Sequence, residues 1–234
     1  MKITHIDVHA CAVPPTPTAL YRIEKDRSLQ EQLDADTRPK YIAQVHTDAG
    51  ITGLGESHRG IDPALVHGAL QPLIGLDPLA LNLRRLPVEP SIAYDVGEIA
   101  LYDIVGQAAG LSVCQLLGGP YRSWVGAHYW MGKRTPEESA DIALEGRAKG
   151  FTGVKIKCGK DAPDQESVAR VRAIRDAVGD EFELELDANG GFRMRDDLED
   201  LCAQLHELGV ARLEDPYPRA DTAPFAQLRG RIKL

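Results

Sequence analysis

Charged residues end three successive predicted strands of this chain, and their types suit metal-assisted proton abstraction. Lys157, Asp187 and Glu214 each end a short run in which apolar and charged residues alternate. Two carboxylates provide hard oxygen ligands of the kind that Mg²⁺ accepts. A positive ion and partial desolvation beside a lysine disfavour its ammonium form, so its pKa should fall and it can act as a base. The three residues therefore predict a magnesium site with an adjacent general base.

The alternation also indicates on which face of the strands these groups lie. Val154 and Ile156 share one face of their strand, and Lys155 shares the other face with Lys157. The charged face of the next strand carries Glu183, Glu185, Asp187 and Asn189. Buried charges are costly unless they are paired or bound to a metal. The apolar face should therefore meet helices, and the charged face should line the other side of the sheet.

Each of these signals has a plainer explanation. Two lysines separated by one residue on a strand usually mark a solvated face, and a single acid after a strand often caps a helix. The acids Glu183 and Glu185 also fit the exposed face of an antiparallel sheet. Recurrence over three successive strands, each ending in a suitable residue type on the same face, favours the metal site.

Beyond residue 125 the chain alternates predicted strands and helices in units of about 30 residues, which is typical of a parallel sheet. The predicted strands are 125–131, 152–158, 182–188 and 211–215. Thr135-Pro136-Glu137-Glu138 is a capping box that starts a helix. Either a barrel or an open doubly wound sheet fits this rhythm. No GxGxxG motif follows a strand, which disfavours dinucleotide binding.

The first 120 residues have a different pattern. A strand is predicted over residues 2–13, and a hairpin is predicted from strands at 41–47 and 51–56. Helices are predicted at 63–73 and 91–109, and Asp103 in the second of these should be a structural carboxylate with its hydrogen bonds satisfied. The polar, proline-containing stretch 14–40 is predicted to be a long mobile loop, of the kind that often forms a lid.

Composition limits the classes of function. The chain has 234 residues with a formal net charge of −8, and it has no basic run, which disfavours nucleic-acid binding. It has no apolar stretch of membrane-spanning length and no export signal, so no membrane association is expected. Its four cysteines are far apart and form no CxxC pair, which predicts reduced thiols, Cys158 among them as a packing residue, in a cytoplasmic protein.

Several motifs, in order along the chain, resemble those of the enolase superfamily and, within it, of the mandelate racemase and muconate-lactonizing enzyme family. Lys155-Ile156-Lys157 resembles the KxK motif of that family's second barrel strand. Its third- and fourth-strand motifs are resembled by Leu186-Asp187-Ala188-Asn189 and by Leu213-Glu214-Asp215-Pro216, respectively. Segments 52–56, 100–106 and 116–119 resemble parts of its N-terminal capping domain. The resemblance spans nearly the whole chain.

The resemblance implies a fold of class α/β, with an α+β capping domain over residues 1–122 and a partial TIM-type β/α barrel over 123–234. About four barrel strands are present, and residues 14–40 would be the substrate-specificity loop. Asp187 and Glu214 would bind Mg²⁺, and Lys157 would be the base. Lys155 would hold the substrate carboxylate or tune Lys157. The implied substrate contacts are Asn189, Tyr129 and Trp130.

The implied reaction is removal of the proton alpha to a carboxylate of a small molecule through an enediolate. Its outcome would be racemisation or epimerisation, dehydration of a sugar acid, or muconate-type cycloisomerisation. In the family, a third acidic ligand and a second acid–base group lie on later strands, so the 234-residue chain alone is expected to be inactive and to bind metal weakly. A free strand edge predicts a homo-oligomer. The alternatives are a non-catalytic half-barrel scaffold and an unrelated metal-dependent barrel lyase.

Overall fold

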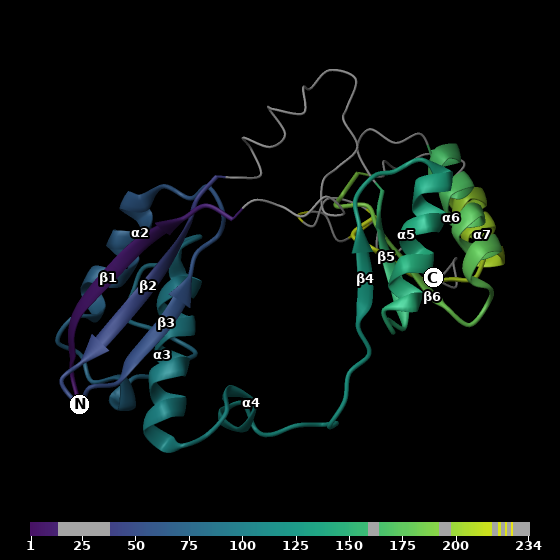
Figure 1. Ribbon diagram of the computed structural model, residues 1–234. Coiled ribbons are helices and arrows are strands. Elements are labelled where there is room, and N and C mark those ends of the chain that lie inside the picture. Colours follow the sequence, from purple (N-terminus) through teal and green to yellow (C-terminus); the bar gives the residue numbers. More distant parts are fainter. Residues whose placement is uncertain are drawn as a thin grey trace. The chain divides into compact units, whose positions relative to one another are not determined.

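The computed structural model describes residues 1–13, 38–158, 164–191 and 198–216, together with positions 220, 223 and 226 (Figure 1). These residues belong to two compact units, which divide after Ser123. Each unit has its own hydrophobic core. The predicted specificity loop at 14–40 lies outside the described residues except for its last three positions. Within the described parts of the chain, no helix has the length and apolar character needed to cross a membrane.

The N-terminal unit contains a three-stranded antiparallel sheet in the order β1-β2-β3 (Figure 1). Its strands are β1 (Ile3–Cys11), β2 (Lys40–Thr47) and β3 (Thr52–Glu56). Its helices are α2 (Pro63–Leu70), the 3₁₀ turns Gln71–Leu73 and Pro78–Ala80, α3 (Tyr94–Ala109) and α4 (Val113–Leu116). The predicted hairpin is therefore confirmed, and both predicted helices form, although each is shorter than its predicted range.

Two glycines in β3 allow α3 to lie directly against the sheet. A Cβ atom added to Gly53 would lie 2.2 Å from the carbonyl oxygen of Ala100, and one added to Gly55 would lie 2.0 Å from that of Val96. Both distances are shorter than any real carbon–oxygen contact. No side chain larger than hydrogen therefore fits at either position without moving the helix.

The Asp103 carboxylate links α3 to the hairpin through hydrogen bonds. Its Oδ2 accepts a hydrogen bond from the backbone N–H of Leu54 at 2.8 Å, and its Oδ1 accepts one from the Gln107 side chain at 3.0 Å. The prediction of a structural carboxylate with satisfied hydrogen bonds is confirmed.

The C-terminal unit contains a four-stranded parallel sheet in the order β4-β5-β6-β7 (Figure 1). Its strands are β4 (His128–Met131), β5 (Gly153–Lys157), β6 (Glu183–Asp187) and β7 (Val210–Glu214). The helices that connect them are α5 (Pro136–Ala148), α6 (Asp164–Val178) and α7 (Leu198–Glu207). The predicted parallel α/β order is confirmed. The first strand is shorter than predicted, because its ladder with β5 begins only at His128.

The start of α5 shows how a local motif sets an element boundary. The Thr135 hydroxyl accepts a hydrogen bond from the backbone N–H of Glu138 at 3.2 Å, and the Glu138 carboxylate accepts one from the Thr135 N–H at 2.9 Å. Pro136 occupies the first helical position, where its missing N–H costs nothing. The predicted capping box is therefore present.

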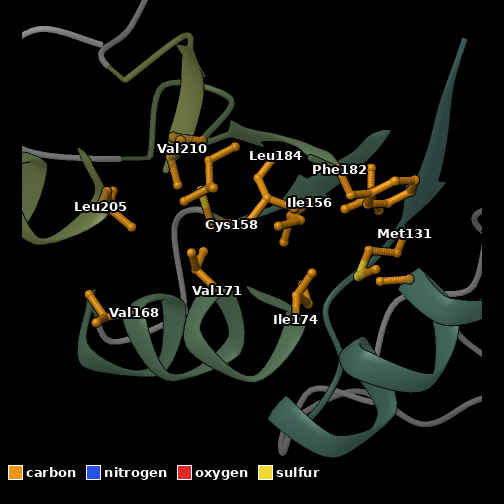
Figure 2. Packing of buried hydrophobic residues seen from close by; sticks show 14 of the residues in the cluster. Met131, Ile156, Cys158, Val168, Val171, Ile174, Phe182, Leu184, Leu205 and Val210 are labelled. Carbon is orange, nitrogen blue, oxygen red and sulfur yellow. The ribbon is translucent and has the colours of Figure 1, made fainter. Parts of the chain in front are cut away.

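The apolar face of the parallel sheet packs against the helices (Figure 2). Ile156 and Leu184 face α6, whose Val171 and Ile174 are fully buried. Cys158 joins this core with 4% exposure, and burial raises the pKa of its thiol to about 12. The prediction that Cys158 is a packing residue is thus confirmed. Burial of this face leaves the alternate, charged residues on the opposite side of the sheet.

Candidate metal and proton-transfer site

Lys157, Asp187 and Glu214 lie side by side at the carboxyl ends of three neighbouring strands. The ladder pairs Lys157 of β5 with Asp187 of β6, and it pairs Asp187 with Glu214 of β7. Residues that pair in a parallel ladder project to the same face, so the three side chains meet at one edge of the sheet. The structure brings together all three residues that the sequence singled out for chemistry.

The lysines of β5 join these carboxylates into one network. The Lys157 ammonium donates to Oδ2 of Asp187 and, at 2.5 Å, to Oδ1 of Asn189. The Lys155 ammonium donates to Glu214 and lies 3.2 Å from the same Oδ2 of Asp187. Each lysine therefore has a carboxylate partner, and Asp187 is shared between the two.

The environment fixes the charge state of the shared carboxylate. Asp187 is 1% exposed, and burial alone would raise the pKa of its carboxyl group. Hydrogen bonds from Lys157, Lys155 and the backbone N–H of Asn189 outweigh that effect and hold the Asp187 pKa below its usual value. Burial alone would lower the pKa of Lys155. Hydrogen bonds to Glu214 and Asp187 and the negative charges of these two groups outweigh burial and raise the Lys155 pKa. Asp187 is an anion here, and Lys155 is a cation.

Nearer the amino ends of the strands, a second layer of charges continues the network. The Arg212 guanidinium lies 2.5 Å from Oε1 of Glu183 and 3.1 Å from Oε2 of Glu185. His128 contacts the same two acids at 3.2 and 3.5 Å. Lys155 links the layers, because its ammonium lies 3.6 Å from Oε1 of Glu185. The charged face of the sheet is thus paired along its length.

A third acid joins the predicted ligands. Oxygen atoms of Asp187, Glu214 and Asp215 all lie within 4.8 Å of one another. Strand alternation would send Asp215 to the face opposite Glu214, but Asp215 has a φ of 46°, which turns the chain as the strand ends. Sequence reasoning assigned Asp215 no role, although its position directly after Glu214 was the available signal. Three carboxylates this close fit a hard divalent cation such as Mg²⁺.

Asn189 contacts both Lys157 and Asp187. Its side-chain oxygen accepts a hydrogen bond from Lys157, and its backbone N–H donates to Oδ1 of Asp187 at 3.1 Å. Its φ of 46° is the left-handed conformation that asparagine tolerates better than most residues. Asn189 therefore orients both the lysine and the carboxylate.

The two predicted aromatic contacts lie on opposite faces of β4. The Tyr129 hydroxyl donates to Glu145 of α5 at 3.1 Å, and the ring packs against Phe151 at 4.9 Å. Tyr129, one of the predicted substrate contacts, thus lies on the helix face of β4, opposite the charged face. Trp130 pairs in the ladder with Lys155, so it shares the face of the charged network.

Arg170 of α6 is a buried residue that sequence reasoning missed. It is 1% exposed, and it donates to the carbonyl oxygens of Lys157 at 2.8 Å and Gly132 at 3.1 Å. It therefore ties the helix to the carboxyl ends of β4 and β5, next to Lys157. Burial lowers the Arg170 pKa. Its spacing of four residues before Ile174, on the apolar side of the helix, was the signal in the sequence.

An α+β unit followed by parallel βα units with carboxylates at the strand ends is an arrangement seen in barrel enzymes, which carry their chemistry at the carboxyl ends of the strands. Residues 138–234 match the family model described as Enolase C-terminal domain-like. L-Ala-D/L-Glu epimerase from Bacillus subtilis is 31% identical over 233 residues, which cover 95% of this chain and 62% of that protein. Chloromuconate cycloisomerase from Delftia acidovorans is 26% identical over 229 residues, which cover 90% of this chain and 61% of that protein.

A solved structure extends the likeness to the fold of the whole chain. The dipeptide epimerase from Enterococcus faecalis, complexed with Mg and the dipeptide L-Leu-L-Tyr, superimposes with a TM-score of 0.81 at 28% identity. That match covers all of this chain and 66% of the epimerase. The chain belongs to the enolase superfamily, in the mandelate racemase and muconate-lactonizing enzyme family. It spans 54–62% of the length of the first curated relatives that it matches.

Proposed function

We propose that this chain carries the magnesium-binding and base-bearing part of a racemase or epimerase that acts on a dipeptide or an N-acylated amino acid. The row formed by Lys157, Asp187 and Glu214 at adjacent strand ends is the observation that carries this proposal. The epimerase relatives support the choice of reaction, and an N-succinyl-L-Arg/Lys racemase from Bacillus cereus, 26% identical over 211 residues, supports the N-acylated substrate class. All these substrate classes have an acidifiable proton beside a carboxylate or carbonyl group.

Each residue of the site has a chemical task in this reaction. Asp187 and Glu214, with Asp215 beside them, would hold Mg²⁺, which when bound supplies Lewis-acid stabilisation for negative charge on a substrate carboxylate. Lys157, in its neutral form, removes the proton from the alpha carbon. Lys155 supplies a fixed positive charge next to the substrate carboxylate, and Asn189 keeps the Lys157 amine aimed at its target.

The test measures exchange of the substrate alpha proton in ²H₂O with the complete gene product, a panel of dipeptides and Mg²⁺. We expect Lys157→Met to lower the exchange rate by about 10² to 10⁴-fold, the usual contribution of a positioned base, while Mg²⁺ affinity stays within about twofold. The control is Lys149→Met, because Lys149 is an exposed lysine paired with Glu145 on α5. If the Lys157 variant exchanged the alpha proton at the full rate, a group other than Lys157 would be the base.

Asp187→Asn separates metal binding from proton transfer. It should weaken Mg²⁺ binding by at least about tenfold, because Mg²⁺ gives up its water reluctantly and depends on anionic ligands. Calorimetric titration with MgCl₂ measures this without any substrate. Unchanged affinity in this variant would place the metal elsewhere.

Cycloisomerisation is the second candidate, because the chloromuconate cycloisomerase aligns over 90% of this chain. The same lysine and carboxylates would serve that reaction, so the site alone does not separate the two. Loss of muconate absorbance in the presence of the complete gene product, with no exchange on any dipeptide, would favour the cycloisomerase.

A further inference from the structure

A second group of metal-ligating side chains lies in the N-terminal unit, on the face of the sheet turned away from the core. His5 and Asp7 of β1 and His46 of β2 each present one ligand atom, and these atoms all lie within 4.8 Å of one another. Nε2 of His46 is 3.1 Å from Oδ2 of Asp7, and Nε2 of His5 is 4.0 Å from the same oxygen. None of these residues has a task in the proposed reaction.

A β-bulge in the first strand creates this arrangement. Ile3 pairs with Thr47, but His5 pairs with His46, so the first strand advances two residues where the second advances one. Ile3 is 1% exposed, and in a regular strand His5 would share its buried face. The extra residue turns His5 outward. The His5 and His46 rings then stack with centroids 4.2 Å apart and an interplanar angle of 8°.

Thr4, the extra residue of the bulge, contacts His5 through its hydroxyl group. The hydroxyl donates to the carbonyl oxygen of His46 at 3.2 Å, and its oxygen lies 3.0 Å from Nδ1 of His5. Because the hydroxyl has one proton, this arrangement favours the tautomer of His5 that carries its proton on Nδ1. The lone pair of a neutral His5 then lies on Nε2, the nitrogen that faces Asp7. An engaged Nδ1 and a free Nε2 are the usual state of a metal-binding histidine.

His46 is oriented in a similar way. Its Nδ1 lies 3.0 Å from the hydroxyl oxygen of Thr52 on β3, so its Nε2 is the nitrogen directed at Asp7. A hydrogen bond from Nε2–H of His46 satisfies one oxygen of Asp7. One divalent ion would contact all three ligand atoms once the stacked rings rotate so that their Nε2 lone pairs point at it.

We propose that His5 Nε2, His46 Nε2 and an oxygen of Asp7 form a binding site for a borderline divalent transition metal such as Zn²⁺, with water completing the coordination. Two imidazole nitrogens select such an ion over Mg²⁺, which prefers oxygen ligands. The His5, Asp7 and His46 side chains are 61%, 53% and 25% exposed, so solvent and ions reach the site. Because β1 is an edge strand of its sheet, the ion would fasten that edge to β2.

The test titrates the purified, untagged full chain with ZnCl₂ in a calorimeter and records the absorption spectrum of bound Co²⁺. We expect one Zn²⁺ per chain that a hundredfold excess of MgCl₂ does not displace. His46→Ala and His5→Ala should each weaken binding by at least about tenfold, because each removes one of three ligands. Thr4→Val should weaken it by about tenfold, the usual effect of losing a group that orients a ligand.

Two control variants make the outcome specific. His9 projects from the same strand but pairs with Gln44 at 3.1 Å, so His9→Ala should bind Zn²⁺ like the parent. Asp187→Asn should also retain this Zn²⁺, which distinguishes the site from the carboxylates of the parallel sheet. Circular dichroism checks that each variant is folded. Absence of Zn²⁺ binding by the parent, or undiminished binding by folded His5→Ala and His46→Ala, would overturn the proposal.

Discussion

The two sheets of this protein place charged and metal-ligating groups on their non-core faces by different means. In the parallel sheet, the register alone aligns Lys157, Asp187 and Glu214, because each is the last residue of its strand. In the antiparallel sheet, a bulge brings His5 opposite His46. A regular sequence pattern therefore reveals the first group, whereas the second depends on a one-residue irregularity.

The two groups also differ in how their charges are balanced. On the charged face of the parallel sheet, ammonium and guanidinium groups from β5 and β7 pair with the carboxylates of Glu183, Glu185, Asp187 and Glu214. Around Asp7 the neighbours are imidazoles, which carry a full positive charge only when protonated. The parallel sheet should therefore depend on its ion pairs and buried polar contacts for stability, and the antiparallel sheet should depend on close apolar packing. Substitutions that attack each of these features test the difference.

The largest effect is expected from Arg170→Met, which attacks the polar support of the parallel sheet. Methionine keeps much of the apolar stem but leaves the carbonyl oxygens of Lys157 and Gly132 without the donors they have now. We expect a loss of about 3 kcal/mol in the free energy of unfolding, since each buried polar group without a partner costs about 1–3 kcal/mol. Urea unfolding measures the loss. Arg172→Met, on the exposed side of the same helix, should change stability by less than about 0.5 kcal/mol.

The next largest effect is expected from Gly55→Ala, which attacks the packing of the antiparallel sheet. The new methyl group would lie 2.0 Å from the Val96 carbonyl oxygen, so β3 and α3 must separate. We expect a loss of about 2 kcal/mol, within the usual range for overpacking. Gly68→Ala is the matched control, because a Cβ atom there meets nothing within 4 Å and alanine favours a helix. Equal effects of the two changes would show that β3 and α3 are not closely packed.

Much of the fold could be predicted from the sequence because the signals were local and periodic. The capping box at Thr135, the apolar spacing in α6 and the alternation in β5 and β6 each follow from one element, and their order gave the parallel sheet. Arg170 escaped prediction because a single polar residue on an apolar helix face does not reveal what it contacts. The prediction that Tyr129 contacts substrate could not take its partner Glu145 into account, because that contact comes from tertiary packing.

The bulge at Thr4 was equally hidden. It changes which residues of the first strand face outward, but no proline or glycine marks it in the sequence. Asp215 shows the same limit at a strand end, because the backbone turn that carries it toward Glu214 has no periodic signal. Periodicity predicts regular elements, and the irregular positions are those at which candidate ligand groups were missed.

A smaller effect is expected from pH, and it should fall on the parallel sheet. The ordinary pKa of an aspartate side chain is about 3.9, and the pKa of Asp187 in the native protein lies below that value. As the pH falls, the unfolded chain therefore binds a proton at Asp187 before the native chain does. The stabilisation is complete above the ordinary pKa and is lost as pH falls through the native pKa. Asp187→Asn should reduce proton uptake on unfolding by up to about one, measured as a shallower dependence of stability on pH below about 5. Asp176→Asn, at an exposed position on α6, should keep the parental slope.

The smallest effect is expected from Tyr129→Phe, which tests the assignment of faces on β4. The substitution removes only a hydroxyl group that contacts Glu145 and Lys149, both exposed residues of the helix side, and it keeps the ring against Phe151. Exposed polar contacts of this kind contribute little, so the melting temperature should hardly change. Because the hydroxyl lies on the face opposite Lys155, alpha-proton exchange by the complete gene product should keep its KM and its kcat. Trp130→Ala is the informative partner, since Trp130 shares the face of Lys155. Trp130→Ala should raise KM if the substrate contacts that face. If Tyr129→Phe raised KM more than Trp130→Ala did, the assignment of the two faces of β4 would have to be reversed.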